Sequence, residues 1–241
     1  MKKHTFYLMI CFVLSSFLLS SCLKDDDNNY IDIPAGGLTM INGFSDAQGI
    51  VYYADQRAVQ NPYFPLMYKG YDWVGLFTGN RNIIVKGTQD PKTLVDTTFA
   101  VKDSVYYSSF TFGNKDKAKH FITEDKKMSI TSGTEKQTGL RFFNLADMPG
   151  KVSLQIGDAA LNDKFKDRAT ETQTTATANQ IFLPQASGTF KLSVKDESGT
   201  VLVSRDGIKL DPDNYYSIIL VGKKDNTNTP LYIGVVKQAV N

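Results

Sequence analysis

Five of the aromatic side chains within residues 61–77 (NPYFPLMYKGYDWVGLF) could bind a ligand. They are Tyr63, Phe64, Tyr68, Tyr71 and Trp73, the last being the only tryptophan of the chain. Exposed aromatic rings stack on the apolar faces of sugars or anchor a protein partner. Buried aromatic rings are also common in core strands, so a core role is the alternative interpretation. These five residues are the candidate ligand-binding residues.

Carboxylates are the other groups that could carry chemistry. The chain has 25 Asp and Glu residues, and a pair of them could act as acid and base in hydrolysis. No G-x-S-x-G, P-loop or H-E-x-x-H pattern is present, and no calcium-binding loop pattern either. His120 lies among charged neighbours and is expected on the surface. We therefore expect no catalytic residue, no cofactor and no metal ligand.

The N-terminus has the composition of an export signal. Lys2 and Lys3 precede an apolar run over residues 6–19, which is too short to span a bilayer. The sequence Leu-Ser-Ser-Cys22 then resembles the bacterial lipobox, and the following LKDDD resembles the signal that carries Bacteroidetes lipoproteins to the cell surface. The alternatives are a plain secretory signal and a buried helix. We expect residues 1–21 to be a signal peptide and Cys22 to be acylated, for example by palmitate.

Removal of this leader would change the charge and the cysteine count. The loss of Lys2 and Lys3 from 27 basic residues leaves 25, equal to the 25 acidic ones. The chain would keep one cysteine, Cys22, and one histidine, His120. An acylated Cys22 can form no disulfide, and a structural Cys/His zinc site lacks ligands. A neutral chain without a basic block also argues against nucleic acid as a partner.

The sequence contains a weak internal repeat. Residues 38–42 (LTMIN) match 140–144 (LRFFN), and 105–113 (VYYSSFTFG) match 214–222 (NYYSIILVG). The matches occur in the same order in both copies. This order predicts two tandem domains with the following organisation: an acidic tether over 22–36, domain 1 over 37–122, a linker over 123–138 and domain 2 over 139–241.

Each copy is typical of β-structure. Short runs rich in Val, Ile, Thr, Tyr and Phe alternate with turn residues, which predicts an all-β fold of two small Ig-like β-sandwich domains. A hairpin is expected between residues 190–195 and 201–204, around Glu-Ser-Gly-Thr. Residues 161–180 could open with a helical turn, but their Thr-rich second half favours a mobile loop. Residues 231–236 alternate and are expected to close the sheet of the second domain.

The second copy resembles the DUF4397 domain of bacterial exported proteins. The resemblance rests on residues 140–146 (LRFFNLA), 182–184 (FLP), 188–190 (GTF) and 213–222 (DNYYSIILVG). The first copy departs from this pattern, because residues 73–77 and 79–83 replace the block that contains proline in the family. The resemblance implies a β-sandwich-like fold and transfers no catalytic residues.

These observations favour a non-catalytic binding or structural lipoprotein of the outer membrane, facing the cell exterior. The membrane would hold it through the lipid at Cys22, and its partner would be a glycan or another envelope protein. The alternatives are a glycan hydrolase with paired carboxylates and a pilin-like subunit. Two triplets, at Thr97 and Ser104, also resemble the Asp-Ser/Thr-apolar sites at which Bacteroidetes attach O-glycans.

Overall fold

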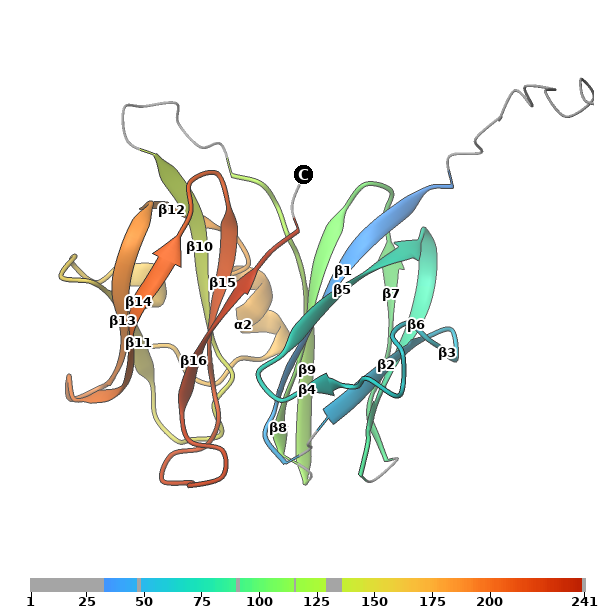
Figure 1. Cartoon of the computed structure of the whole chain (residues 1–241), viewed down its shortest axis with the longest axis horizontal. Coiled ribbons are helices and arrows are strands. Elements are labelled where there is room, and N and C mark those ends of the chain that lie inside the picture. Colours follow the sequence, from blue (N-terminus) through green and yellow to red (C-terminus); the bar gives the residue numbers. More distant parts are fainter. Residues whose placement is uncertain (1–32, 47–48, 90–91, 115, 129–135, 240–241) are drawn as a thin grey trace, which may run out of the picture. The chain divides into compact units, whose positions relative to one another are not determined.

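The computed structural model describes residues 33–46, 49–89, 92–114, 116–128 and 136–239. Cys22 and the predicted signal peptide therefore lie outside the described residues, as does most of the predicted linker. The described part is almost entirely β-structure (Figure 1), with one short α-helix, α2 (Gln173–Ala178), and one 3-10 helix, η2 (Asp163–Phe165). Within this part of the chain, no helix has the length and hydropathy needed to cross a membrane.

The N-terminal half, residues 34–128, forms two sheets around one core. Sheet A has the strand order β5-β1-β8-β9, with the bounds Tyr71–Phe77, Ala35–Phe44, Tyr106–Asn114 and Lys117–Glu124. Sheet B has the order β3-β2-β6-β7, with the bounds Arg57–Ala58, Gly49–Ala54, Gly79–Gly87 and Thr93–Val101, and β4 (Leu66–Met67) also pairs with β2. The core between them includes Leu38, Ile83 and Val85, all inaccessible to solvent.

The C-terminal half, residues 136–239, repeats this arrangement. Sheet C has the strand order β12-β10-β15-β16, with the bounds Leu183–Ala186, Gln137–Asn144, Tyr215–Val221 and Tyr232–Lys237. Sheet D has the order β11-β13-β14, with the bounds Val152–Ile156, Gly188–Asp196 and Val201–Leu210. Its core includes Leu140, Leu192 and Ile218. The all-β prediction is confirmed, and each pair of sheets packs face to face as in a sandwich.

The repeated sequences occupy the same positions in the two halves. Gly37 pairs with Tyr106 in the parallel ladder of β1 and β8, as Gly139 pairs with Tyr215 in that of β10 and β15. The hydroxyl of Tyr107 accepts a hydrogen bond from the amide five residues earlier at 3.2 Å, and the equivalent Tyr216 does the same at 3.2 Å. The two halves therefore share one strand frame, whereas their division into two Ig-like domains stays a prediction.

Asn42 and Asn144, which end the first repeated sequence, also have the same role. Each side chain accepts from the amide two residues later, at 2.8 and 3.1 Å, and donates to a carbonyl of the segment that crosses it, at 2.8 and 3.0 Å. A buried asparagine is stable only when its amide is satisfied in this way. The match of these two residues in the sequence therefore reflects equivalent positions in the strand frames of the two halves.

The two halves meet through the outer faces of sheets A and C. An apolar cluster joins Ile41, Phe110, Phe112 and Phe121 of the first half to Phe143, Leu145, Ala176, Ile219, Val221 and Val236 of the second. The middle of sheet A, at β1 and β8, is therefore covered on both faces, which explains why these two strands are buried along almost their whole length. Pro34–Asn241 forms one compact unit.

A buried ion pair crosses the same junction. The Arg141 Nη2 lies 2.6 Å from the Asp125 Oδ1, and its Nε donates to the Ser217 hydroxyl at 2.7 Å. The Ser108 hydroxyl lies 2.6 Å from the Asp125 Oδ2. Arg141 and Asp125 are almost completely buried. Asp125 follows β9 directly, so the first residues of the predicted linker belong to the folded structure.

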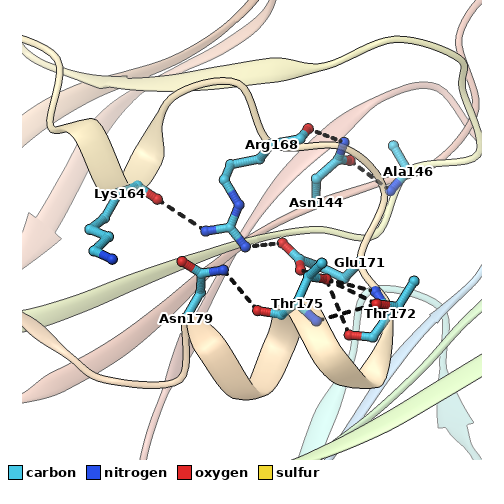
Figure 2. Close-up of polar contacts among 8 residues, drawn as sticks. All are labelled: Asn144, Ala146, Lys164, Arg168, Glu171, Thr172, Thr175 and Asn179. Atoms are coloured by element: carbon cyan, nitrogen blue, oxygen red, sulfur yellow. Dashed lines mark hydrogen bonds and ion pairs between the residues drawn. The ribbon is translucent and has the colours of Figure 1, made fainter.

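The prediction of a mobile loop in the Thr-rich part of residues 161–180 is wrong. This part forms α2, because the Thr172 and Thr175 side chains each accept the backbone N–H of the other in a capping box (Figure 2). The Gln173 amide also bonds the backbone of Ile122 in both directions, at 3.1 and 2.9 Å. The helix therefore covers the edge of β9, which would otherwise be an unpaired edge strand.

Candidate ligand-binding surface

The exposed aromatic residues of the described chain are concentrated in one segment. Those with a large exposed fraction are Tyr63, Phe64, Tyr71, Trp73 and Phe77, all within residues 63–77. Solvent-exposed aromatic rings are rarely clustered in this way without a binding role, because exposed apolar surface is unfavourable in water. We call this segment, residues 63–77, the aromatic segment.

Tyr63 and Phe64 lie in the loop between β3 and β4, which belongs to sheet B. They are 89% and 77% exposed. Asn61 shapes the loop, since its side chain accepts from the Tyr63 amide at 3.0 Å and its carbonyl accepts from the Phe64 amide at 2.9 Å. These two residues lie in a loop of sheet B, whereas Tyr71 and Trp73 lie on β5 of sheet A, so the candidate residues come from two different sheets.

Tyr68 differs from the other candidates because it contributes to the junction of the halves. Its ring packs against the apolar cluster between sheets A and C. Burial raises the pKa of its hydroxyl to about 12, and that hydroxyl is buried without a hydrogen-bond partner among the described residues. Tyr68 is therefore a packing residue, and we remove it from the candidate ligand-binding residues.

Tyr71, Trp73 and Phe77 share the outer face of β5. This strand lies at the edge of sheet A beside β1 (Figure 1). Its intervening residues Val74 and Leu76 point into the core, as the two-residue period of a strand requires. Trp73 is 52% exposed, so the alternative interpretation of Trp73 as a core residue is wrong. Phe77 was missed, although the alternation of residues 71–77 would have placed it on the same face.

Two further residues, Gly37 and Tyr106, belong to this surface. A Cβ atom on Gly37 would lie 2.9 Å from the Trp73 Nε1 and 2.6 Å from the Tyr106 ring. The two rings therefore lie over the bare backbone of Gly37, one from each neighbouring strand. The outer-face residues of β5 and of the facing stretch of β1 are Tyr71, Trp73, Gly75, Phe77, Ala35, Gly37 and Thr39, and none is charged.

The buried carboxylates do not form a catalytic pair. Asp125 is held by Arg141, and Glu171 is held by Arg168 beside α2 (Figure 2). Burial raises the pKa of the Glu171 carboxyl, although a hydrogen bond from Thr175 and the charge of Arg168 lower it. Burial lowers the pKa of the Arg141 guanidinium, opposed by the charge of Asp125. Each buried carboxylate is thus committed to one arginine, which is typical of a structural ion pair.

His120 is not the surface side chain that the sequence suggested. Burial lowers its pKa to about 4, and its Nε2 lies 2.8 Å from the Ser109 hydroxyl. A Ser–His pair can be catalytic when the histidine accepts the serine proton. Here Ser109 is completely buried and donates to the Tyr52 hydroxyl at 3.2 Å, so the histidine nitrogen is left to donate. The pair is therefore a structural hydrogen-bond chain.

One pocket among the described residues lies beside α2. Its lining includes Arg141, Phe142, Phe165, Arg168 and Ile181. The Arg168 guanidinium donates to the Lys164 carbonyl at 3.0 Å and to the Glu171 carboxylate, as Figure 2 shows. Both arginines are already paired, so they are not available to orient an anionic ligand.

The remaining sequence predictions concern metal binding and modification. Among the described residues, no group of three or more His, Cys, Asp or Glu side chains could hold a metal ion. Ser104 is exposed in the turn between β7 and β8, whereas Thr97 lies within β7 and is half-buried. Glycosylation of either residue stays a prediction.

Comparisons with known proteins do not assign a family. No family model matches the chain, and no curated protein matches it. Among solved structures, it is similar to a family 26 carbohydrate-binding module of Eubacterium rectale in complex with maltoheptaose, with a TM-score of 0.27, 12% identity, and coverage of 84% of this chain and 97% of that one. A DUF3823 family protein of Bacteroides ovatus follows, with a TM-score of 0.19, 12% identity, and coverage of 73% and 98%. Likenesses at these TM-scores support no conclusion on fold or function, and the resemblance to DUF4397 stays a prediction.

Proposed function

We propose that this protein is a non-catalytic binding module of the bacterial cell envelope that binds neutral glycans. The observation that carries the proposal is the row of Tyr71, Trp73 and Phe77, three exposed rings on one uncharged face of an edge strand. Pyranose rings have apolar C–H faces that stack on such rings. The absence of charge on this face favours a neutral sugar over an anionic one.

The affinity of the purified protein for polysaccharides tests the proposal. Affinity electrophoresis in gels that contain xyloglucan, mixed-linkage β-glucan or galactomannan would show retardation of the wild-type protein by at least one of them. Trp73→Ala should weaken the retardation strongly, because removal of a central aromatic ring costs about 2 kcal/mol or more of binding free energy. Ile181→Ala is the matched control, since Ile181 is 62% exposed on the other half. Equal retardation of all three proteins would contradict the proposal.

We also propose that a lipid on Cys22 anchors the protein to the outer membrane, facing the exterior. The proposal rests on the lipobox-like sequence and the charged residues that follow it. More than one acyl chain is needed for stable anchoring. Cys22→Ala should move the protein from the outer-membrane fraction to a soluble fraction. Continued sedimentation of this variant with the outer membrane would show that the anchor lies elsewhere.

A further inference from the structure

Two glycines leave part of the outer face of β1 and β5 without side chains. Gly37 of β1 and Gly75 of β5 are direct register partners, so both have their missing side chains on the outer face of sheet A. The two glycines differ in what covers them. The Cβ position of Gly37 is occupied by the Trp73 and Tyr106 rings, whereas no atom lies within 4 Å of the Cβ position of Gly75. Gly75 is therefore an open gap in the surface.

Aromatic rings stand on both sides of this gap. Trp73 and Phe77 are each two residues from Gly75 on the same face of β5, so their Cα atoms lie about 13 Å apart along the strand. Phe77 pairs with Ala35, whose small side chain leaves that end of the face open. We call this open position above Gly75, between the positions of Trp73 and Phe77 on the same face, the trough. None of the outer-face residues of β5 and of the facing stretch of β1 is charged.

The backbone of Gly75 also offers hydrogen bonds at the trough. The Gly37 amide donates to the Val105 carbonyl at 3.0 Å, so the hydrogen-bonding groups of Gly37 face β8 and not β5. In an antiparallel ladder, Gly37 and Gly75 are then a non-hydrogen-bonded pair. The N–H and C=O groups of Gly75 consequently point away from β1, toward the free edge of sheet A, where ligand hydroxyl groups could reach them.

The C-terminal half has a proline, Pro184, at the position equivalent to Gly75. Gly139 corresponds to Gly37, and its Cβ position lies 2.5 Å from the Tyr215 ring and 3.2 Å from the Phe182 Cβ. Phe182 is almost completely buried and packs edge-to-face on Tyr215, with 5.1 Å between the ring centroids. Pro184 stands opposite Gly139 where Gly75 stands opposite Gly37. Phe182 thus corresponds to Trp73, and the position that is open at Gly75 carries the side-chain ring of Pro184 in the other half.

We propose that the trough at Gly75 is the central sugar subsite, which takes the apolar face of one neutral pyranose ring while its hydroxyl groups bond the Gly75 backbone. This inference rests on the proposed glycan binding and identifies where on the surface the ring lies. It assigns the sugar contact in the trough to Trp73 and Phe77 and not to Tyr63 and Phe64, which lie in the loop between β3 and β4.

Gly75→Val tests the subsite without disturbing the fold. The new side chain enters open space, and valine is favourable in strands, so the melting temperature should stay the same or rise slightly. The branched side chain would fill the trough and keep a sugar ring from lying flat. On the polysaccharide that retards the wild-type protein most, we expect an apparent Kd at least about tenfold higher. Thr189→Val, an exposed strand position of sheet D, is the matched control and should bind like the wild type.

The outcomes distinguish the subsite from the proposed function. If Trp73→Ala loses binding while Gly75→Val binds like the wild type, the subsite at Gly75 is wrong and the glycan-binding surface remains. If the wild-type protein binds none of the three polysaccharides, the glycan proposal itself is wrong, and the surface is better explained as a protein contact. Should Gly75→Val unfold, Gly75→Ala provides the second variant, and unchanged affinity of a folded Gly75→Ala would also overturn the subsite.

Discussion

The two halves share a strand frame but differ in the side chains that occupy equivalent positions. Above the mid-strand glycine, the C-terminal half packs Phe182 in the interior, whereas the N-terminal half leaves Trp73 exposed and Gly75 open. The comparison separates the two roles that an aromatic ring can have on the same backbone. Where a ring is buried it stabilises the half, and where it is exposed it is available for binding.

The cores of the two halves also differ, in the polarity of their side chains. Ser109, Thr111 and His120 line the core side of sheet A, and the register aligns them with Ile218, Leu220 and Ile233 of sheet C. The first set forms a hydrogen-bond chain with Tyr52, while the second is purely aliphatic. A polar chain in a core is stable only when each member is satisfied. The N-terminal half therefore has the more polar core and the more exposed surface.

The junction combines equivalent positions from both halves. Ser108 corresponds to Ser217, and Asp125 corresponds to Gln238, since their amides donate to the carbonyls of Tyr106 and Tyr215 at 2.8 and 2.9 Å. The equivalence of side chains ends at Arg141, because the corresponding residue of the first half is the uncharged Thr39. The buried ion pair of the junction thus takes its arginine from the second half and its aspartate from the end of the first half.

The largest effect is expected from breaking this ion pair. Asp125→Ala leaves the Arg141 guanidinium buried without its counter-charge, which should lower the free energy of unfolding by about 3–5 kcal/mol. Gln238→Ala, at the equivalent neutral position, should cost about 1–2 kcal/mol, because it removes hydrogen bonds but no charge. Urea denaturation monitored by circular dichroism measures both. Equal losses would show that the charge of Asp125 contributes nothing specific to the junction.

Truncation of one ring in each half tests the contrast between buried and exposed aromatics. Phe182→Ala should cost about 3–5 kcal/mol of unfolding free energy, since it creates a cavity under Tyr215. Trp73→Ala should cost about 1 kcal/mol or less, because surface substitutions away from the core have small effects. Urea denaturation monitored by circular dichroism measures both losses of unfolding free energy. A loss for Trp73→Ala as large as that for Phe182→Ala would show that Trp73 is a structural residue after all.

The polar core of the N-terminal half should make stability depend on pH. His120 has a pKa of about 4 in the folded state, below its ordinary value of 6.5. Between these values the unfolded chain binds a proton that the folded one does not, so stability is full above pH 6.5 and falls as the pH drops toward 4. The slope for one group is at most about 1.4 kcal/mol per pH unit. The difference between the wild-type and His120→Gln unfolding curves isolates this contribution. A difference that is independent of pH over this window would contradict the lowered pKa of His120.

The smallest effect on the unfolding free energy is expected from removing one tyrosine hydroxyl, and it should be the same in both halves. Tyr107→Phe and Tyr216→Phe each remove the hydroxyl that accepts a backbone amide at 3.2 Å. Each should lower the unfolding free energy by about 1 kcal/mol, the typical net contribution of one hydrogen bond. Clearly unequal losses would indicate that the two tyrosines do not have the same structural role, despite their matching registers.

Several structural features could be predicted from the sequence because they depend on local pattern. The hairpin between β13 and β14 is confirmed, and so is the pairing of residues 231–236 with β15 in the sheet of their own half. Both predictions relied on turn residues between alternating runs, whose geometry is set within a few residues. Helix α2 could not be predicted in this way, because Thr-rich segments have low helix propensity and its stability comes from the capping box and its contacts with β9.

The sequence by itself determined the all-β fold, the repeat order and the segment in which exposed aromatic residues occur. These properties follow from side-chain period and composition, which each residue carries wherever it lies. Only the tertiary structure decided that Tyr68 packs in the junction, that His120 is partly buried beside Ser109 and that Gly75 stands open between Trp73 and Phe77. The physical reason is that exposure depends on which strand lies alongside and what covers its face. Those neighbours are distant in the sequence, as Gly37 is from both Gly75 and Tyr106.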